Sequence, residues 1–234
     1  MNHITQVNNV SEFDRFLGVL DQAKCLKSIL AIGSWAEHIY RETGMLKGYE
    51  ANMRTLDADF LVKNLHLPRT PVDLPKIAKE NGYLYQEDYM TGGSRMIGED
   101  GFEIEFLIAQ RGSGSRKLPK TNLGIYAQEL THLDVLLRFS TDVIYHGFAV
   151  SVPEPEAYVL HKIIINQGRG VKAAKDRDSI ARLYPCVNQD RYRKIFETLS
   201  RKEQITVQNF QEQYPDLFLL SSKEESMENK GHRQ

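Results

Sequence analysis

The chain has 234 residues, 41% of them hydrophobic, which is enough for a substantial core in one large domain or in one domain with a smaller partner. Because 30 Lys and Arg residues stand against 31 Asp and Glu, any attraction to nucleic acid must be local. Two distant cysteines, Cys25 and Cys186, argue against a disulfide framework or a zinc site, and no apolar run approaches the roughly 18 residues of a membrane helix, so we expect a soluble cytoplasmic protein without an export signal.

Helix and strand patterns alternate over the first two thirds of the chain. Ser11 and Asp14 resemble a capping box, and the apolar residues that follow at helical spacing predict a helix over about 11 to 26. The next elements are predicted as strand, helix, strand, helix and three further strands, at 28–33, 34–44, 56–62, 73–83, 83–89, 94–98 and 102–109. The stretch 142–153 predicts a hairpin that turns at His146 and Gly147.

The pattern becomes helical from Pro153 onward, with helices predicted at 153–167, 171–184, 190–200 and 203–214. The fold class predicted is therefore α/β (α+β): a mixed-sheet domain over 1–152, followed by a C-terminal helical domain over 153–220. Residues 221–234 are polar and lack apolar anchors, which predicts a disordered tail.

Acidic side chains alternate with apolar ones on two of the predicted strands. In "TLDADFLV" Asp57 and Asp59 share one face, and in "FEIEFLI" Glu103 and Glu105 do the same. Each strand taken alone is also compatible with an ordinary half-exposed strand whose acids are solvated. Together, carboxylates at this spacing repel one another unless a cation lies between them, and such clusters bind Mg²⁺.

Gly33 and Ser34 join the first predicted strand directly to a helix. A helix amino terminus leaves backbone N–H groups unpaired and carries partial positive charge, and a glycine lets an anion approach the backbone. A triphosphate on this turn, with metal ions held by acids on the next strand, suits phosphoryl or nucleotidyl transfer.

These motifs resemble the nucleotidyltransferase superfamily that includes DNA polymerase β, whose pattern is glycine-serine, D-x-D and a third carboxylate. The form Arg54-Thr55-Leu56-Asp57-Ala58-Asp59 is similar to a bacterial branch that contains abortive-infection type toxins and uncharacterised relatives. The resemblance extends over about 28 to 184, because the helical stretch with His161-Lys162, Arg169 and Lys175-Asp176 also looks like that branch. The gap between turn and D-x-D is longer than in minimal members of the superfamily.

The resemblance implies a nucleotidyltransferase domain over 1–152 that moves NMP from an NTP such as ATP to an acceptor hydroxyl and releases pyrophosphate. Asp57, Asp59 and Glu105 would be the catalytic acids and would bind two Mg²⁺ or Mn²⁺ ions. Glu105 stands where aspartate is common, and Glu103 on the same face is a competing third acid that spacing does not exclude. Gly33 and Ser34 would hold the β- and γ-phosphates.

A basic segment at 161–177 contains five basic residues against one acid, Asp176. A solvated helix face is one interpretation; beside the acids, a phosphate-binding role is preferable. The predicted nucleotide-binding cations are Lys162, Arg169, Lys172 and Lys175, and Asp176 is expected to orient Lys175 or Arg177.

Two other functions stay open from the sequence. One is a nucleotide- or RNA-binding protein on the same scaffold without catalysis, which a nonstandard third acid would permit. The other is a toxin-like nucleotidyltransferase controlled by an antitoxin protein. The acceptor, whether RNA or tRNA, protein or small molecule, depends on loops and surface shape.

Overall fold

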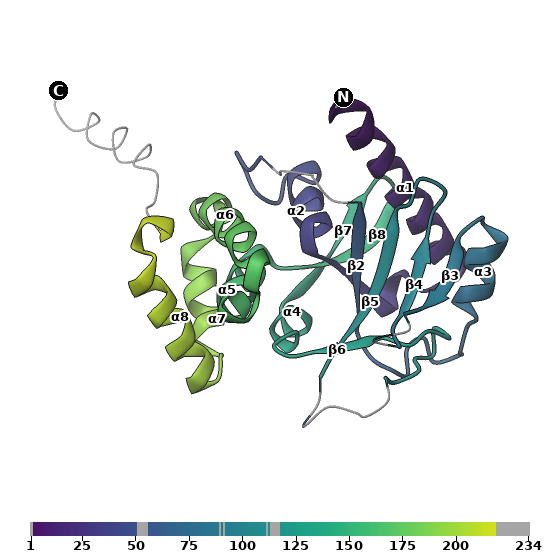
Figure 1. Ribbon diagram of the computed structural model, residues 1–234. Coiled ribbons are helices and arrows are strands. Elements are labelled where there is room, and N and C mark those ends of the chain that lie inside the picture. Colours follow the sequence, from purple (N-terminus) through teal and green to yellow (C-terminus); the bar gives the residue numbers. More distant parts are fainter. Residues whose placement is uncertain are drawn as a thin grey trace. The chain divides into compact units, whose positions relative to one another are not determined.

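The structure is a computed structural model that describes residues 2–50, 56–88, 90, 92–110, 112 and 118–218, with side chains described from residue 12 onward. The chain divides between Glu154 and Pro155 into two compact units, called below the sheet unit (1–154) and the helical unit (155–234) (Figure 1). The predicted tail at 221–234 lies outside the described residues. Within the described ranges, no helix has the length and apolar character needed to cross a membrane.

The main sheet of the sheet unit mixes parallel and antiparallel strands. Its order is β1 (Ile29–Ile32), β2 (Asp57–Val62), β5 (Glu103–Ala109), β4 (Ser94–Ile97) and β3 (Leu84–Glu87). The β2–β5 pair is parallel, whereas β1–β2, β5–β4 and β4–β3 are antiparallel. A strand that the sequence patterns did not predict, β6 (Gln128–Leu130), pairs in parallel with the second half of β5. The predicted mixed sheet is confirmed.

A second, two-stranded sheet is the hairpin of β7 (Ser140–Tyr145) with β8 (Phe148–Pro153). The hairpin turns at His146 and Gly147, as predicted. Both residues have positive φ values, 46° and 88°. Lys63, directly after β2, donates from Nζ to Ser151 Oγ in β8 at 2.7 Å, which ties the hairpin to the main sheet. The short helix α4 (Asp134–Arg138) before the hairpin was not predicted.

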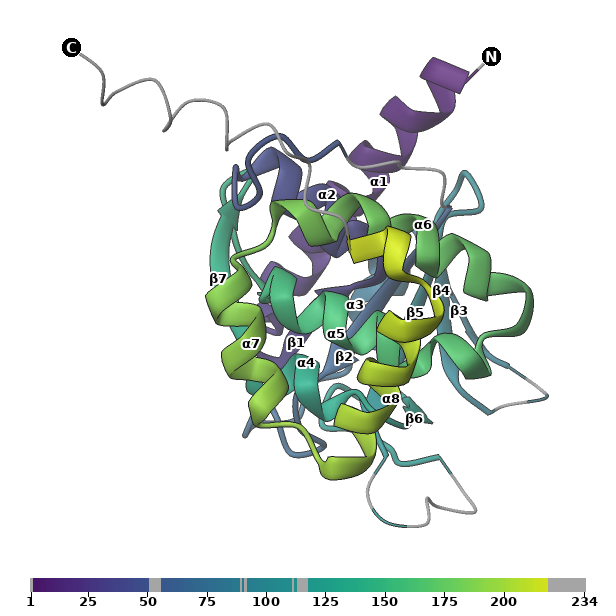
Figure 2. The same cartoon turned by 90° about the vertical axis from the view of Figure 1, so that its left-hand side faces the viewer.

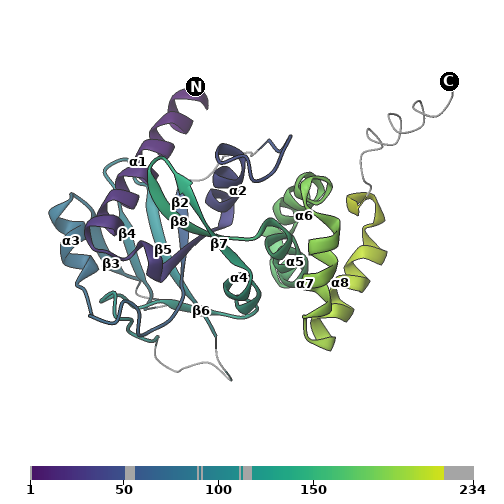
Figure 3. The ribbon, with the colours of Figure 1, turned by 180° about the vertical axis from the view of Figure 1, so that it is seen from behind.

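Helix α1 (Asn2–Gln22) packs across one face of the main sheet (Figure 3). Phe16 contacts Phe60 of β2 and Phe106 of β5, with ring centroids 5.8 and 6.4 Å apart. The predicted helical spacing of Phe13, Phe16, Leu17 and Leu20 is confirmed, since all four side chains are buried. The predicted start at Ser11 is wrong, because the helix continues nine residues further toward the amino terminus and Ser11 lies inside it.

Two further helices belong to the sheet unit, α2 (Gly33–Glu42) and α3 (Leu74–Glu80). Helix α3 begins where predicted, because the side chain of Asp73 accepts a hydrogen bond from Lys76 N at 3.1 Å and caps the first turn. Helix α2 begins directly at the end of β1 with no intervening loop. This direct join places the first residues of α2 at the edge of strand β2, which pairs with β1.

The helical unit contains α5 (Pro155–Ile165), α6 (Ala173–Leu183), α7 (Gln189–Glu197) and α8 (Arg201–Gln213), seen in Figure 2. All four were predicted. Ser200 and Glu203 form a capping box at the start of α8, and Asn188 caps α7. Apolar side chains from each helix form a shared core that includes Leu160, Ile163, Ile180, Leu183, Ile195, Val207 and Phe210.

Candidate functional site

Four carboxylates lie on one face of the main sheet, and together they are called the acidic face: Asp57, Asp59, Glu103 and Glu105. The parallel register of β2 and β5 pairs Asp57 with Glu103 and Asp59 with Glu105. Residues paired in this way present their side chains on the same face of a sheet. The alternate residues Phe60 and Phe106 are buried under α1, so the two faces of these strands have opposite character, as the alternation predicted.

The Gly-Ser turn lies directly beside Asp59. Ile32, the last residue of β1, pairs with Asp59 across the antiparallel β1–β2 ladder. Gly33 then adopts a φ of 65°, a left-handed conformation that glycine tolerates best. A Cβ atom at Gly33 would lie 2.8 Å from Asp59 Oδ2, so the absence of a side chain at 33 is what lets this carboxylate approach the turn.

Trp35 fixes the first turn of α2 to the start of β2. Its indole Nε1 donates to the backbone oxygen of Asp57 at 3.1 Å. The ring is 1% exposed and stacks on Phe13 of α1, with centroids 3.9 Å apart. Trp35 is therefore a core residue that positions the backbone of an acidic-face residue.

Arg95 of β4 is the residue of this region that sequence reasoning missed. The antiparallel β4–β5 register pairs it with Glu105. Its Nη2 lies 3.0 Å from Glu105 Oε1 and 3.7 Å from Asp88 Oδ2, and its Nη1 lies 3.2 Å from Glu103 Oε2. The signal available in the sequence was the alternation of "SRMI" opposite "FEIE", which places Arg95 on the acidic face once the pairing is known.

The donor chemistry of the acidic face fits a hard divalent cation, because carboxylate oxygens are the protein ligands of Mg²⁺ and Mn²⁺, with water completing the coordination. In the described part of the chain, however, no three His, Cys, Asp or Glu side chains are gathered closely enough to hold a metal ion. Both glutamates of the acidic face are instead paired with Arg95.

His38 is a buried base four residues after the turn. It is 3% exposed, and burial, followed by the nearby Arg41 cation, lowers its pKa to about 4. Arg41 Nη2 lies 3.3 Å from His38 Nδ1, and the ring meets Trp35 edge-on at 5.5 Å. Both of these contacts are with other residues of α2.

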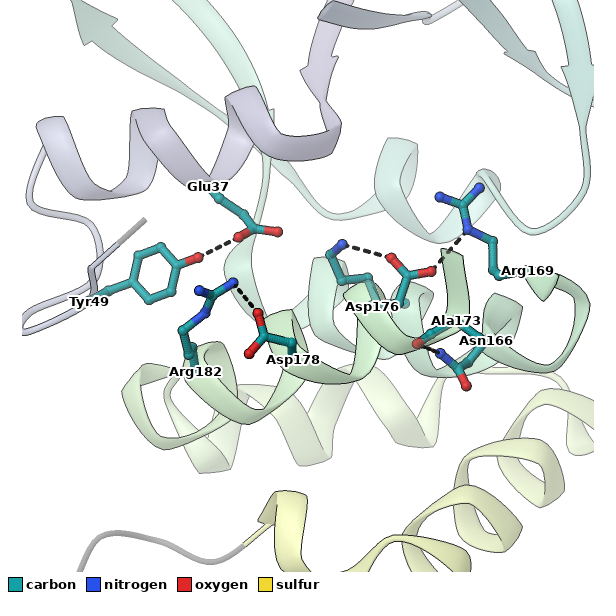
Figure 4. A network of polar contacts seen from close by, with 9 residues as sticks. Glu37, Tyr49, Asn166, Arg169, Ala173, Asp176, Asp178 and Arg182 are labelled. Atoms are coloured by element: carbon teal, nitrogen blue, oxygen red, sulfur yellow. Dashed lines mark hydrogen bonds and ion pairs between the residues drawn. The ribbon is translucent and has the colours of Figure 1, made fainter. Parts of the chain in front are cut away.

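In the helical unit, Asp176 gathers two of the predicted nucleotide-binding cations. Lys162 Nζ lies 3.1 Å from Asp176 Oδ1, and Arg169 Nε lies 2.9 Å from Oδ2; the contact with Arg169 is drawn in Figure 4. These three residues are called the Asp176 cluster. Asp176 is 3% exposed and Lys162 is 9% exposed, whereas the side chain of Arg169 is 37% exposed, so the cluster is buried at its carboxylate and open to solvent at Arg169.

The expectation that Asp176 orients Lys175 or Arg177 is therefore wrong. Its partners come from α5 and from the loop before α6, not from its own turn of helix. Arg177 instead donates to Asn166 Oδ1 at 3.4 Å and lies over the ring of Tyr214. Lys172 and Lys175, the other two predicted cations, are exposed.

A pocket of about 170 Å³ lies at the carboxyl ends of β2 and β5. The acidic-face residues lie toward the amino ends of the same strands. Lys63, Ile108 and Glu129 are among the residues that line the pocket. Burial lowers the pKa of Lys63, whose ammonium group donates to Ser151 as described above. None of the acidic-face residues lines this pocket, so it is a separate feature.

Arg54 and Thr55, part of the motif that resembles the nucleotidyltransferases, lie outside the described residues. Comparison with known proteins found a crystal structure of an antigenic nucleotidyltransferase-like protein from Paracoccidioides brasiliensis, which is 17% identical. The alignment covers 87% of this chain and 90% of that one with a TM-score of 0.49, a similarity too weak to support a conclusion. No curated protein matches this chain.

A family described as nucleotidyltransferase matches residues 11–204, a range that includes the Gly-Ser turn, the acidic face and the Asp176 cluster. The match covers well over half of the chain and extends beyond the region that carried the resemblance in the sequence. By this match the chain belongs to the nucleotidyltransferase family.

Proposed function

We propose that this protein transfers a nucleoside monophosphate from an NTP to an acceptor hydroxyl in a reaction that depends on a divalent metal. One observation carries the proposal. Asp57, Asp59 and Glu105 lie on one face of paired strands, with Asp59 Oδ2 directly at Gly33 of the Gly-Ser turn, in a chain of the nucleotidyltransferase family. In the reaction, the acceptor oxygen forms a bond to the α-phosphorus, the α–β phosphoanhydride bond breaks, and pyrophosphate leaves.

Asp57 and Asp59 would hold two Mg²⁺ or Mn²⁺ ions, and Glu105 would complete the acceptor side of the site. Bound metal ions supply charge neutralisation at the attacking and leaving oxygens. Glu105 would also take the proton of the acceptor hydroxyl as its oxygen attacks. The register supports this division of roles, because Glu105 lies directly across from Asp59.

Gly33 and Ser34 would bind the β- and γ-phosphates. They open a ten-residue helix, α2, and backbone N–H groups at a helix amino terminus point along the axis toward a bound anion. Partial positive charge at such a terminus stabilises a phosphate, and Trp35 keeps the terminus beside β2 through its bond to Asp57 O. The chain therefore provides a rigid join rather than a loop at the proposed phosphate position.

Lys162, Arg169, Lys172 and Lys175 of the helical unit are proposed as nucleotide-binding cations. These four cations fall into two pairs that differ in their exposure and in their partners. Lys172 and Lys175 are exposed, so a phosphate could reach them from solvent. Lys162 and Arg169 are already fixed by Asp176, which reduces the conformational entropy lost when they bind an anion.

The direct test is transfer of label from each of four NTPs, labelled at the α-phosphate, with Mg²⁺ or Mn²⁺ and total cellular RNA or protein as acceptor. We expect label in the acceptor, pyrophosphate in solution, and no transfer by Asp57→Asn with its fold intact. An Asp57→Asn variant with full metal-dependent activity would overturn the assignment.

Other results would select the two rival functions. NTP binding without pyrophosphate release would make the protein a nucleotide- or RNA-binding member of the family. Growth arrest on expression in the cytoplasm, lost in Asp57→Asn, would favour a toxin that an antitoxin protein controls. A cytoplasmic setting, where NTP and Mg²⁺ are available, is proposed for the transferase and for the toxin. Both cysteines are free thiols in the structure, which fits a reducing compartment.

A further inference from the structure

Three charged residues form a row across three neighbouring strands. Arg95 of β4 pairs with Glu105 of β5, and Glu105 pairs on its other side with Asp59 of β2. Glu105 therefore lies between a guanidinium group and the carboxylate that touches the Gly-Ser turn. Its carboxylate is bound to the guanidinium, with Oε1 and Nη2 3.0 Å apart.

A cation bound at Glu105 would weaken this ion pair. A guanidinium and a divalent cation compete for the same carboxylate oxygens, and they also repel each other. We propose that Arg95 is a positioning residue that holds the third acid before the metal site is filled, and that Glu105 exchanges Arg95 for the cation. This inference rests on the proposed function.

The same contacts separate the roles of the two glutamates. Glu103 Oε2 lies 3.2 Å from Nη1 of Arg95, the nitrogen that Glu105 does not use. When Glu105 leaves, Arg95 still has Glu103 as a partner, with Asp88 Oδ2 3.7 Å from Nη2. Glu103 is therefore the residue that retains Arg95, and Glu105 is the one that joins Asp57 and Asp59. All these side chains are about a third exposed, so the exchange does not strand a buried charge.

Removing the charge of Arg95 should therefore tighten cation binding. The competing partner of Glu105 is lost, and so is one positive charge that repels the metal. A unit charge about 6 Å from a divalent ion in a solvent-like medium changes the affinity by about tenfold. If Arg95 only supported the fold, its removal would leave the affinity unchanged or lower it.

Trp35 provides a local reporter for the test. It is the single tryptophan of the chain, and its indole binds the backbone of Asp57. Tb³⁺ is a hard cation that would be sensitised by excitation of this ring when bound at the acidic face. We expect a luminescence signal from the full-length protein that Mg²⁺ displaces and that Asp59→Asn abolishes.

In Arg95→Gln we expect the Mg²⁺ concentration for half displacement to fall about tenfold. Arg95→Lys keeps the charge and should stay close to the wild type, although lysine cannot bridge both glutamates in the same way. Arg193→Gln is the matched control, since it removes an arginine from an exposed pair with Asp190 in the helical unit. Arg193→Gln should leave the Mg²⁺ concentration for half displacement unchanged.

A second series identifies the exchanging acid and guards against a folding defect, which thermal melting would reveal. In the Arg95→Gln background, Glu105→Gln should remove the tightened binding and Glu103→Gln should retain it. Unchanged or weaker Mg²⁺ binding in a folded Arg95→Gln would overturn the exchange while leaving the proposed function standing. A wild type that gives no displaceable signal would instead overturn the proposed metal site, and with it both proposals.

Discussion

The acidic face and the Asp176 cluster both contain ion pairs, but the ratio of acidic to basic groups is opposite in the two regions. On the acidic face, one guanidinium group, that of Arg95, lies beside Glu103, Glu105 and the nearby Asp88, and these side chains are about a third exposed. In the Asp176 cluster one carboxylate serves two cations, Lys162 and Arg169, and its side chain is 4% exposed. The first arrangement leaves excess negative charge open to solvent, which suits a cation. The second leaves excess positive charge around a buried carboxylate.

The largest effect expected from this comparison is on activity at the acidic face. Asp59→Asn should lower nucleotidyl transfer by about a thousandfold, because it removes a charged oxygen donor from the proposed metal site. The melting temperature should change little, since removing one of several like charges relieves repulsion. Asp100→Asn, in the exposed turn before β5, is the control and should retain activity. Equal losses in both variants would break the comparison.

The opposite result is expected at Asp176. Asp176→Ala should lower the free energy of unfolding by about 3 kcal/mol, because it leaves the buried Lys162 without its carboxylate. Asp178→Ala, two residues along α6, removes a 61% exposed acid that pairs with Arg182, and should cost less than about 1 kcal/mol. Urea denaturation of the two variants gives both values. Similar losses would mean that burial does not distinguish the Asp176 cluster.

A third test separates backbone strain from contact with the acidic face. Gly33 and Gly44 both have left-handed φ values, 65° and 69°, but only a Cβ at Gly33 would meet Asp59. Either alanine should cost about 1 kcal/mol of stability from backbone strain. Gly33→Ala should in addition slow transfer by about thirtyfold, because it displaces the Asp59 carboxylate. Steady-state kinetics of the two variants would show no difference if the approach of Asp59 to the turn were unimportant.

The smallest effect concerns His38, a buried base beside an arginine, in contrast to the buried acid between two cations at Asp176. Its pKa is lowered to about 4 in the folded protein, so the unfolded chain binds the proton first as the pH falls below the ordinary value of 6.5. The free energy of unfolding should decrease by about 1 kcal/mol from about pH 7 to about pH 5.5. His38→Phe should lack this part of the pH dependence in denaturation curves. An identical pH dependence in both proteins would contradict the shifted pKa.

Most elements of the fold were predictable because they are long or strongly patterned. Strands β2 and β5 alternate acidic and apolar residues, and α5 to α8 repeat apolar residues at helical spacing. The missed elements are three and five residues long, β6 and α4, which is too short for either periodicity to register. The start of α1 was misplaced because a capping pattern at Ser11 lies within a helix that continues past it.

The contacts of the candidate site were likewise predictable only where they are local in the sequence. The proximity of Asp57, Asp59 and Gly33 follows from strands adjacent in the sequence, so it could be predicted. The partners of Arg95 and Asp176 could not, because they depend on which strand or helix packs beside which. Arg95 reaches Glu105 through strand pairing, and Asp176 reaches Lys162 across two helices, 14 positions away. Local charge spacing instead pointed to neighbours of Asp176 on its own helix.

A hydrogen bond at the far end of α2 has a mechanical consequence. Tyr40 Oη donates to the backbone oxygen of Pro153 at 2.8 Å, and Pro153 is the last residue of β8. Tyr40 is fully buried, so the bond is shielded from water. The polypeptide thus departs the sheet unit from a point pinned to the helix that opens at Gly33. Tension applied to the chain just beyond Pro153 would load this bond together with the pairing of Pro153 with Ser140 of β7.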